Sequence, residues 1–275
     1  MTDDPVLLHD DPAPGVRRLT LNRPAKRNAL SNQLRGALFA ALEAADTDPE
    51  VRVIVIRGAG TCFSSGYDLA GVGPLPFHTA GNQAQWARHV VEGCFRMWDL
   101  AKPIIAQVHG WCLAGGSELA FACDLVYVAE DAQVGYPAVR TMSPPDNQFY
   151  PWLMGMRAGM ELMLTGNSIS GIEAVRLQFA NRAFPLDRLE EEVLAMASRI
   201  ARVDPELAQL NKRLVHRQME AMGLRAGLRA GTELHGLGWH TGASRAYMGK
   251  MREGVKQALD VRDAEFGDYG TGPKG

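Results

Sequence analysis

Short apolar runs alternate with amphipathic stretches over the first half of the chain. Apolar, largely β-branched runs predict strands at residues 16–21, 51–57, 104–108, 125–128 and 132–136. Apolar side chains near helical spacing predict helices after Ser31, which can act as an N-cap, over residues 82–100, and from about Glu118 onward. Residues 71–81 are rich in glycine and proline and predict a mobile loop. This β, β, α rhythm indicates an α/β core.

The pattern changes at about residue 151 and becomes mostly helical. The clearest helical stretches are 186–200, 205–222 and 251–266, and no strand pattern recurs among them. We therefore divide the chain into a core over residues 1–200 and a helical C-terminal region over residues 201–275. Apolar helix faces that one small core cannot cover commonly pack against a neighbouring subunit, so we expect an oligomer.

Composition and charge narrow the classes of function. The chain has 275 residues, 46% hydrophobic and 22% charged, enough for one substantial globular core. A net charge of -2 and a pI near 6.4 leave no general basic surface for nucleic acid. The longest apolar stretches fall far short of the roughly 18 residues that span a bilayer, and the N-terminus lacks a secretory pattern. We expect a soluble, cytoplasmic protein with no nucleic-acid or membrane partner.

The four cysteines give no indication of a metal site. They are Cys62, Cys94, Cys112 and Cys123. They form no CxxC pair and no plausible four-ligand zinc spacing, so we expect reduced thiols and no bound metal.

Glycines follow two of the predicted strands, in the sequences CFSSGYD (62–68) and AGGSE (114–118). Glycine permits close backbone approach, and the second pair precedes a predicted helix, whose free N–H groups and dipole favour negative charge in front of Gly115. Paired backbone donors of this kind stabilise the oxygen of a thioester enolate. Spacing alone favours the simpler interpretation, which is two tight turns.

Five separated motifs resemble the enoyl-CoA hydratase/isomerase, or crotonase, family in sequence and order. They are LNRPAKRNAL (21–30), CFSSGYDL (62–69), KPIIAQVHGWCLAGGSELAFACD (102–124), AQVGYP (132–137) and MELMLTGNSIS (160–170). The resemblance implies an α/β fold made of a spiral of ββα units, with a helical C-terminal region that builds trimers, often paired into hexamers. It also implies an acyl-CoA substrate, with coenzyme A as part of the substrate and no separate cofactor.

The resemblance assigns backbone and surface positions for substrate binding. The oxyanion hole falls on the backbone N–H groups of Tyr67 and Gly115. The CoA-binding positions are Lys26, Arg27, Ser64 and Ser65. The alternative for Lys26 and Arg27 is an ordinary solvated turn, although their charges suit phosphates.

The resemblance also assigns the proton-transfer groups. Glu118 matches the first catalytic glutamate of the hydratases, whereas Ala138 occupies the position of the second and can neither donate nor accept a proton. Asp146 matches an aspartate that transfers protons in the dienoyl-CoA isomerases. The alternative is that Asp146 and Asn147 only form a turn after two prolines.

These observations leave three hypotheses of function. The first is an enzyme of the enoyl-CoA hydratase/isomerase type that acts through an enolate and Glu118. The second is an isomerase that uses Glu118 and Asp146 together, and the third is a catalytically weak acyl-CoA-binding homologue. A nucleotide-binding domain is disfavoured because no GxGxxG follows a strand. His78 and His89 are typical of surface or core histidines, and Ser117 lies outside a GxSxG motif.

Overall fold

The chain is built around a six-stranded sheet with a smaller sheet beside it. The computed structural model describes residues 4–69, 73–79 and 84–269. The main sheet has the order β1-β2-β3-β4-β6-β9. Its strands are β1 (Leu7–Ala13), β2 (Val16–Leu21), β3 (Val53–Gly58), β4 (Ile104–Val108), β6 (Leu125–Ala129) and β9 (Arg182–Phe184). Only β1 pairs antiparallel with its neighbour, and every other pair in this sheet is parallel.

The second sheet and the helices complete the fold. The second sheet has the order β5-β7-β8, formed by β5 (Trp111–Leu113), β7 (Gln133–Gly135) and β8 (Ser168–Ser170). The helices of the core are η1 (Pro24–Lys26), α1 (Asn32–Thr47), α2 (Gln85–Asp99), α3 (Gly115–Phe121), η2 (Pro137–Arg140), α4 (Phe149–Met154), α5 (Met156–Thr165), α6 (Gly171–Arg176) and α7 (Leu186–Ala201). The C-terminal helices are α8 (Pro205–Ala221), α9 (Leu224–Gly238), α10 (Gly242–Glu253) and α11 (Val255–Ala264).

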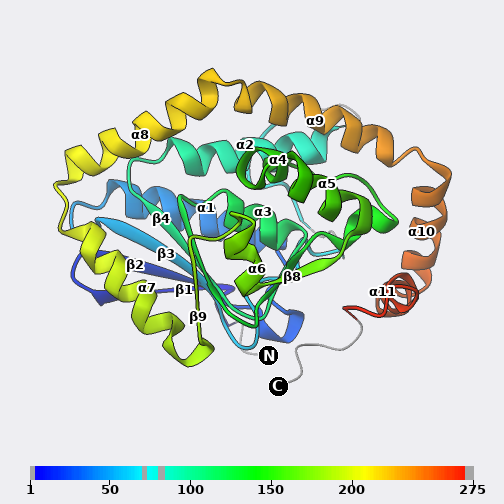
Figure 1. Cartoon of the computed structure of the whole chain (residues 1–275), viewed down its shortest axis with the longest axis horizontal. Coiled ribbons are helices and arrows are strands. Elements are labelled where there is room, and N and C mark those ends of the chain that lie inside the picture. Colours follow the sequence, from blue (N-terminus) through cyan, green and yellow to red (C-terminus); the bar gives the residue numbers. More distant parts are fainter. Residues whose placement is uncertain (1–3, 70–72, 80–83, 270–275) are drawn as a thin grey trace.

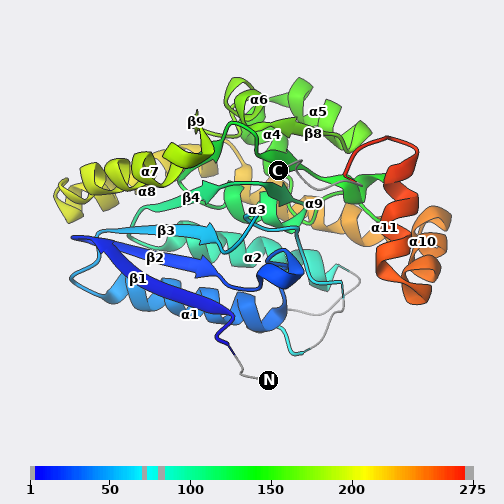
Figure 2. The same cartoon turned by 90° about the horizontal axis from the view of Figure 1, so that it is seen from below.

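The central strands are buried on both faces, as the apolar run in the sequence predicted. In β3, the side chains from Val53 to Ile56 are fully buried. Helix α7 packs against β2, β3, β4 and β6, while α1 packs against β1 and β2 (Figure 2). Parallel strands covered on both sides are typical of α/β folds, because each crossover places a helix on one face.

Several elements differ from the sequence-based expectation. Strands β8 and β9 lie in the region where only helices were expected, and each has three residues, too few for a period-2 pattern to show. Strand β1 was missed because its side chains are mostly exposed and polar. The expected helix over 251–266 is interrupted at Gly254, between α10 and α11. Of the expected loop at 71–81, residues 73–79 contain no helix or strand, and the remainder lies outside the described residues.

The C-terminal helices form an arch along one side of the molecule (Figure 1). Helix α9 packs against α2, and Lys212 of α8 is buried where its Nζ lies 2.8 Å from Asp124 Oδ2. The arch nevertheless exposes large apolar side chains: Leu207, Leu210, Leu214, Val215, Met222, Leu234 and Leu237. None of the helices in the described residues combines the length and apolar character needed to cross a membrane.

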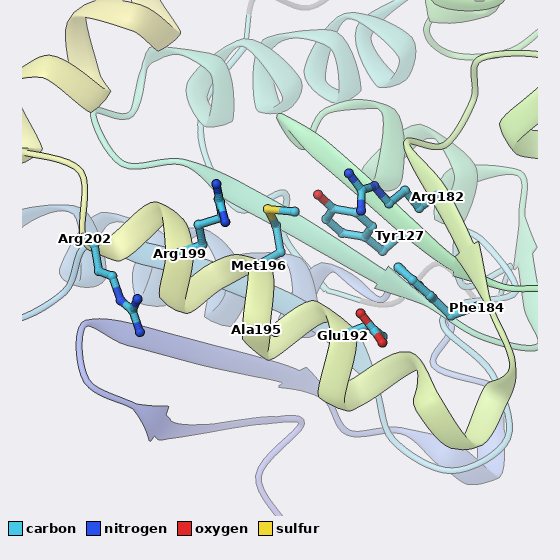
Figure 3. A pocket seen from close by; sticks show the side chains of 8 residues that line it. All are labelled: Tyr127, Arg182, Phe184, Glu192, Ala195, Met196, Arg199 and Arg202. Carbon is cyan, nitrogen blue, oxygen red and sulfur yellow. The ribbon is translucent and has the colours of Figure 1, made fainter.

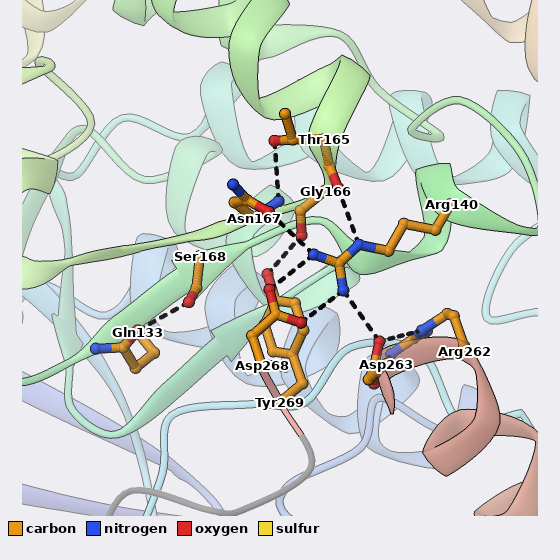
Figure 4. Close-up of polar contacts among 10 residues, drawn as sticks. All are labelled: Gln133, Arg140, Thr165, Gly166, Asn167, Ser168, Arg262, Asp263, Asp268 and Tyr269. Carbon is orange, nitrogen blue, oxygen red and sulfur yellow. Dashed lines mark hydrogen bonds and ion pairs between the residues drawn. The ribbon is translucent and has the colours of Figure 1, made fainter. Parts of the chain in front are cut away.

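Arg140, at the end of η2, joins the core to residues 263–269 (Figure 4). Its Nη1 and Nη2 donate to the two carboxylate oxygens of Asp268 at 2.6 and 2.7 Å, and Nη1 also lies 3.2 Å from Asp263 Oδ1. Its Nε donates to the Thr165 carbonyl at 2.9 Å, and Phe266 stacks on the guanidinium. We call this group the Arg140 cluster.

Replacing Arg140 with methionine is expected to lower the free energy of unfolding by about 2–3 kcal/mol, because Asp268 loses both of its hydrogen bonds to the guanidinium, while Asp263 keeps its pairing with Arg262. The side chain of Arg140 is only 2% exposed. Thermal unfolding followed by circular dichroism measures the change. Arg188→Met is the matched control, since Arg188 is 53% exposed and its ion pair with Glu192 should contribute at most about 1 kcal/mol. Equal losses in the two variants would contradict the buried role.

Candidate active site

Backbone pairing brings the two glycine-rich loops together. Ser64 forms a parallel bridge with Cys112, in which Ser64 N–H donates to the Trp111 carbonyl and Leu113 N–H donates to the Ser64 carbonyl, both at 3.0 Å. Tyr67 forms a second bridge, with Leu30. The loop after β3 and the turn before α3 are therefore held side by side by main-chain hydrogen bonds.

Glycine is required where the two loops meet. Gly66 has φ +104, and a β-carbon there would lie 2.9 Å from the Leu113 carbonyl oxygen and 3.2 Å from Gly115 N. Ala114 precedes α3 with φ 47, in the left-handed region that a non-glycine residue rarely adopts. Such strain is concentrated at functional sites.

Two backbone donors are unpaired at this junction. Within the described residues, neither the N–H of Tyr67 nor that of Gly115 donates a hydrogen bond. Gly115 is the first residue of α3, so its N–H has no partner inside the helix. Both N–H groups are therefore available to an external acceptor, which is what an oxyanion hole requires.

Glu118 lies one turn into α3 and is fully buried. Its Oε2 accepts from the Tyr67 hydroxyl at 2.8 Å and its Oε1 accepts from the Asn147 backbone N–H at 3.1 Å. Burial, followed by the nearby Asp146 carboxyl, raises the pKa of Glu118 well above its usual range, and these hydrogen bonds only partly oppose the shift. Glu118 is thus a carboxyl group whose surroundings disfavour its charged form more than water does.

Asp146 lies close enough to Glu118 for the two carboxyl groups to influence each other. It is 3% exposed, and its Oδ2 accepts from the Tyr136 hydroxyl at 3.2 Å. Burial raises the pKa of Asp146 above its usual range, while interactions with His235, Tyr136 and Arg35 oppose that rise. Two buried carboxyl groups with shifted pKa values are typical of acid–base chemistry.

His235 of α9 contacts Asp146 but does not donate to it. Its Nδ1 lies 2.9 Å from the Pro144 carbonyl, which can only accept, and its Nε2 lies 2.7 Å from Trp239 Nε1, which can only donate. In the neutral ring these roles place the proton on Nδ1, so the Nε2 atom 3.3 Å from Asp146 Oδ1 has none to give in that form. Asp146 Oδ1 has no hydrogen-bond partner within the described residues and is free to accept a proton.

The residues expected to bind CoA lie beside the same junction. Lys26 and Arg27 are exposed, and the Arg27 carbonyl accepts from Ser65 N–H at 2.9 Å. Ser64 is fully buried, and its hydroxyl donates to the Asn28 carbonyl at 2.9 Å. These contacts bring all four positions together, and their role in CoA binding stays a prediction.

A larger pocket lies away from this junction. A cavity of about 290 Å³ lies between α7 and strands β6 and β9 (Figure 3). It is lined by Tyr127, Arg182, Phe184, Glu192, Ala195, Met196, Arg199 and Arg202. It contains no carboxyl pair and no unpaired loop N–H groups, so its size does not make it the reaction site. Among the described residues, no group of three or more His, Cys, Asp or Glu side chains could hold a metal ion.

The other histidines considered are positioned as surface and core residues. His78 is exposed, and His89 is fully buried with its ring stacked on Phe77 at 4.0 Å between centroids. Burial, together with the positive charges of Arg35 and Arg96, lowers the pKa of His89 to about 4.

A family model described as enoyl-CoA hydratase/isomerase matches residues 12–268. The chain belongs to the enoyl-CoA hydratase/isomerase family. Enzymes of this family act on acyl-CoA thioesters, and the unpaired N–H groups and the buried carboxyl pair lie within the matched region. The expected crotonase-like fold is confirmed.

Curated relatives and solved structures of the family match most of the chain. The 2,3-dehydroadipyl-CoA hydratase of Escherichia coli K12 is 33% identical over 91% of this chain and 94% of the relative. The crystal structure of an enoyl-CoA hydratase from Mycobacterium smegmatis has a TM-score of 0.88 at 28% identity, covering 96% of this chain and 95% of that one. A monofunctional enoyl-CoA isomerase from the same organism has a TM-score of 0.65 at 27% identity, covering 80% and 96%. The similarity therefore includes both hydratases and an isomerase.

Three contacts within the candidate site were not predicted from the sequence. They are the Tyr67 hydroxyl and the Asn147 N–H on Glu118, and the contact of His235 with Asp146. Tyr67 was assigned only a backbone role, and Asn147 only a turn. His235 lies on α9, far from the motifs in sequence, and no local signal could have placed it at the site.

Proposed function

We propose that this family member isomerises the double bond of an enoyl- or dienoyl-CoA by moving a proton between two carbons of the acyl chain. The observation that carries the proposal is the buried pair of Glu118 and Asp146, with Ala138 at the position where the resemblance implies a second glutamate. Two carboxyl groups of unequal environment can act as acid and base in one cycle.

The two proton transfers of an isomerisation can be assigned to these two carboxyl groups. Ionised Asp146 removes a proton from the α carbon through Oδ1, and the electron pair moves onto the thioester oxygen. The N–H groups of Tyr67 and Gly115 stabilise that oxygen. Protonated Glu118 then gives its proton to the γ carbon, and the double bond moves into conjugation with the thioester. A proton passes back from Asp146 to Glu118 and restores the starting state.

Two other functions are alternatives to isomerisation. In a hydration, the same two carboxyl groups would hold one water and add it across the double bond. The absence of a carboxylate at Ala138 favours the third reading, an acyl-CoA-binding protein without turnover.

A panel of enoyl- and dienoyl-CoAs incubated in D₂O separates these outcomes by mass spectrometry. We expect a positional isomer that carries solvent deuterium on carbon and no added oxygen, formed at an enzymatic rate of about 1 per second or faster. A product that has gained one water would replace isomerisation by hydration. Tight binding of every acyl-CoA without conversion of any would contradict both enzymatic readings.

We also propose that the exposed apolar face of α8 and α9 is a contact between subunits of a homotrimer or hexamer. Seven large apolar side chains on and beside these helices are exposed in the single chain, from Leu207 to Leu237. Contiguous exposed apolar surface on helices is typical of a protein interface. Light scattering at several protein concentrations measures the assembly.

A further inference from the structure

A buried arginine beside the candidate active site has no carboxylate partner in the part of the chain that the structure describes. Arg35 belongs to α1, on the face that also buries Leu34 and Leu38, and only 5% of its surface is exposed. Burial lowers the pKa of its guanidinium, because an environment with little water disfavours the positive charge. A buried cation without an ion pair is costly for a folded protein.

The contacts of Arg35 within the chain leave most of its donors unused. Its Nη1 donates to Asn32 Oδ1 at 3.2 Å, and its Cζ lies 5.0 Å from the centroid of a Trp86 ring and 5.6 Å from that of the Tyr67 ring. A guanidinium has five N–H donors, so one hydrogen bond and two aromatic faces do not satisfy it.

Among the described residues, no acidic side chain forms an ion pair with this cation, so none of their carboxylate oxygens lies within 4.0 Å of the Arg35 nitrogens. The internal segments outside the description, 70–72 and 80–83, contain no aspartate or glutamate. Glu118 and Asp146 influence Arg35 electrostatically from beyond ion-pair distance.

Arg35 lines a small pocket that reaches the oxyanion position. The pocket has a volume of about 30 Å³ and is lined by residues of α1, α2 and α3, with Tyr67 and Gly115 at the junction of the two loops. Its other lining side chains are almost all apolar: Leu30, Leu38, Phe39, Val90, Cys94, Met97 and Leu119. A volume of about 30 Å³ accommodates a group of about the size of a water molecule, so the pocket has room for the end of a ligand and not for a whole acyl chain. The Arg35 cation in otherwise apolar surroundings suits a ligand end that carries a negative charge.

We infer that Arg35 recognises a carboxylate carried by the acyl group, so that the preferred substrates are CoA thioesters of dicarboxylic acids. This inference rests on the proposed function and specifies its substrate class. A planar guanidinium binds a carboxylate through two parallel hydrogen bonds, and a ligand carboxylate would supply the charge that the chain itself does not place there.

The test is calorimetric titration with a length series of saturated acyl-CoAs, each prepared with a terminal carboxylate and with a terminal methyl group. These ligands lack the reacting double bond, so binding is measured without turnover. At the best chain length, we expect the wild-type protein to bind the carboxylated ligand at least about 10-fold more tightly than its methyl counterpart. Arg35→Met should abolish this preference and leave affinity for the methyl series within about 3-fold of the wild type.

Arg96→Met is the matched control, since Arg96 also stacks on an aromatic ring, that of Phe77, but is 49% exposed and paired with Glu43. It should keep the full preference. A wild-type protein that binds both series equally would overturn the inference and leave the proposed function intact, as would an Arg35→Met variant that keeps the preference. Failure to bind any acyl-CoA would overturn both.

Discussion

Glu118→Gln is expected to reduce turnover of the best enoyl-CoA substrate by about 10³-fold or more while acyl-CoA affinity changes by less than about 3-fold. Glutamine keeps the size of the side chain and can still accept from the Asn147 N–H, so the pocket retains its shape. It cannot deliver a proton to carbon. Single-turnover kinetics and calorimetric titration on the same preparation measure the two effects, and unchanged turnover would eliminate Glu118 as the acid.

The same variant has a pH-dependent effect on stability whose sign follows from burial. Because burial raises the pKa of Glu118 in the folded state, the stability that depends on its neutral form is present at low pH and lost as pH rises through the folded-state pKa. Glutamine does not titrate, so the melting temperature of Glu118→Gln relative to wild type should increase with pH. Each kcal/mol corresponds to about 2–4 °C. A pH-independent difference would show that the pKa of Glu118 is the same in the folded and unfolded states.

Asp146→Asn is expected to lower kcat by about 10²-fold and to remove the acidic limb of the pH–rate profile. Asp146 must be ionised to take a proton. Because its pKa is raised, it ionises at a higher pH than an ordinary aspartate. Activity of the wild type should therefore fall as pH decreases through the pKa of Asp146. Asparagine removes this titration and leaves a low rate that is flat on the acidic side.

The measurement is kcat over a pH series, with Tyr136→Phe as the companion variant. Tyr136 hydrogen-bonds to Asp146 without touching the reacting carbons in the proposed mechanism, so its loss should shift the acidic limb toward higher pH rather than abolish it. If Asp146→Asn keeps the wild-type profile, Asp146 serves only the turn in which it lies, and single-acid chemistry at Glu118 remains.

The sequence predicted the strands that are buried on both faces, because a continuous apolar run leaves little choice of environment. Strands β2, β3 and β4 lie within one or two residues of their predicted bounds. The three-residue strands β8 and β9 could not be predicted, since their pairing depends on partners far away in sequence. The break at Gly254 was missed because the apolar periodicity continues across it.

The sequence predicted Gly115, Glu118 and Asp146 as site residues, because at these positions the residue type and the expected backbone geometry suggest the same role. What the sequence did not reveal is how Glu118 and Asp146 are held. The Tyr67 hydroxyl reaches Glu118 across 51 positions, and His235 contacts Asp146 from a helix 89 positions later. Contacts of this range are set by the packing of whole elements, and a motif read along the chain carries no information about them.

The Arg140 cluster joins a segment near the candidate site to residues close to the end of the chain. Arg140 ends the short helix that begins at Pro137, and its partners Asp263 and Asp268 lie 123 and 128 positions further along the chain. During synthesis, the strands around β3 and the loop at Gly66 can pair long before these partners exist. Arg140 can meet Thr165 earlier, but its ion pairs with Asp263 and Asp268 form only after the last helix has emerged. Nascent chains should therefore pair the strands around β3 early and form these two ion pairs last.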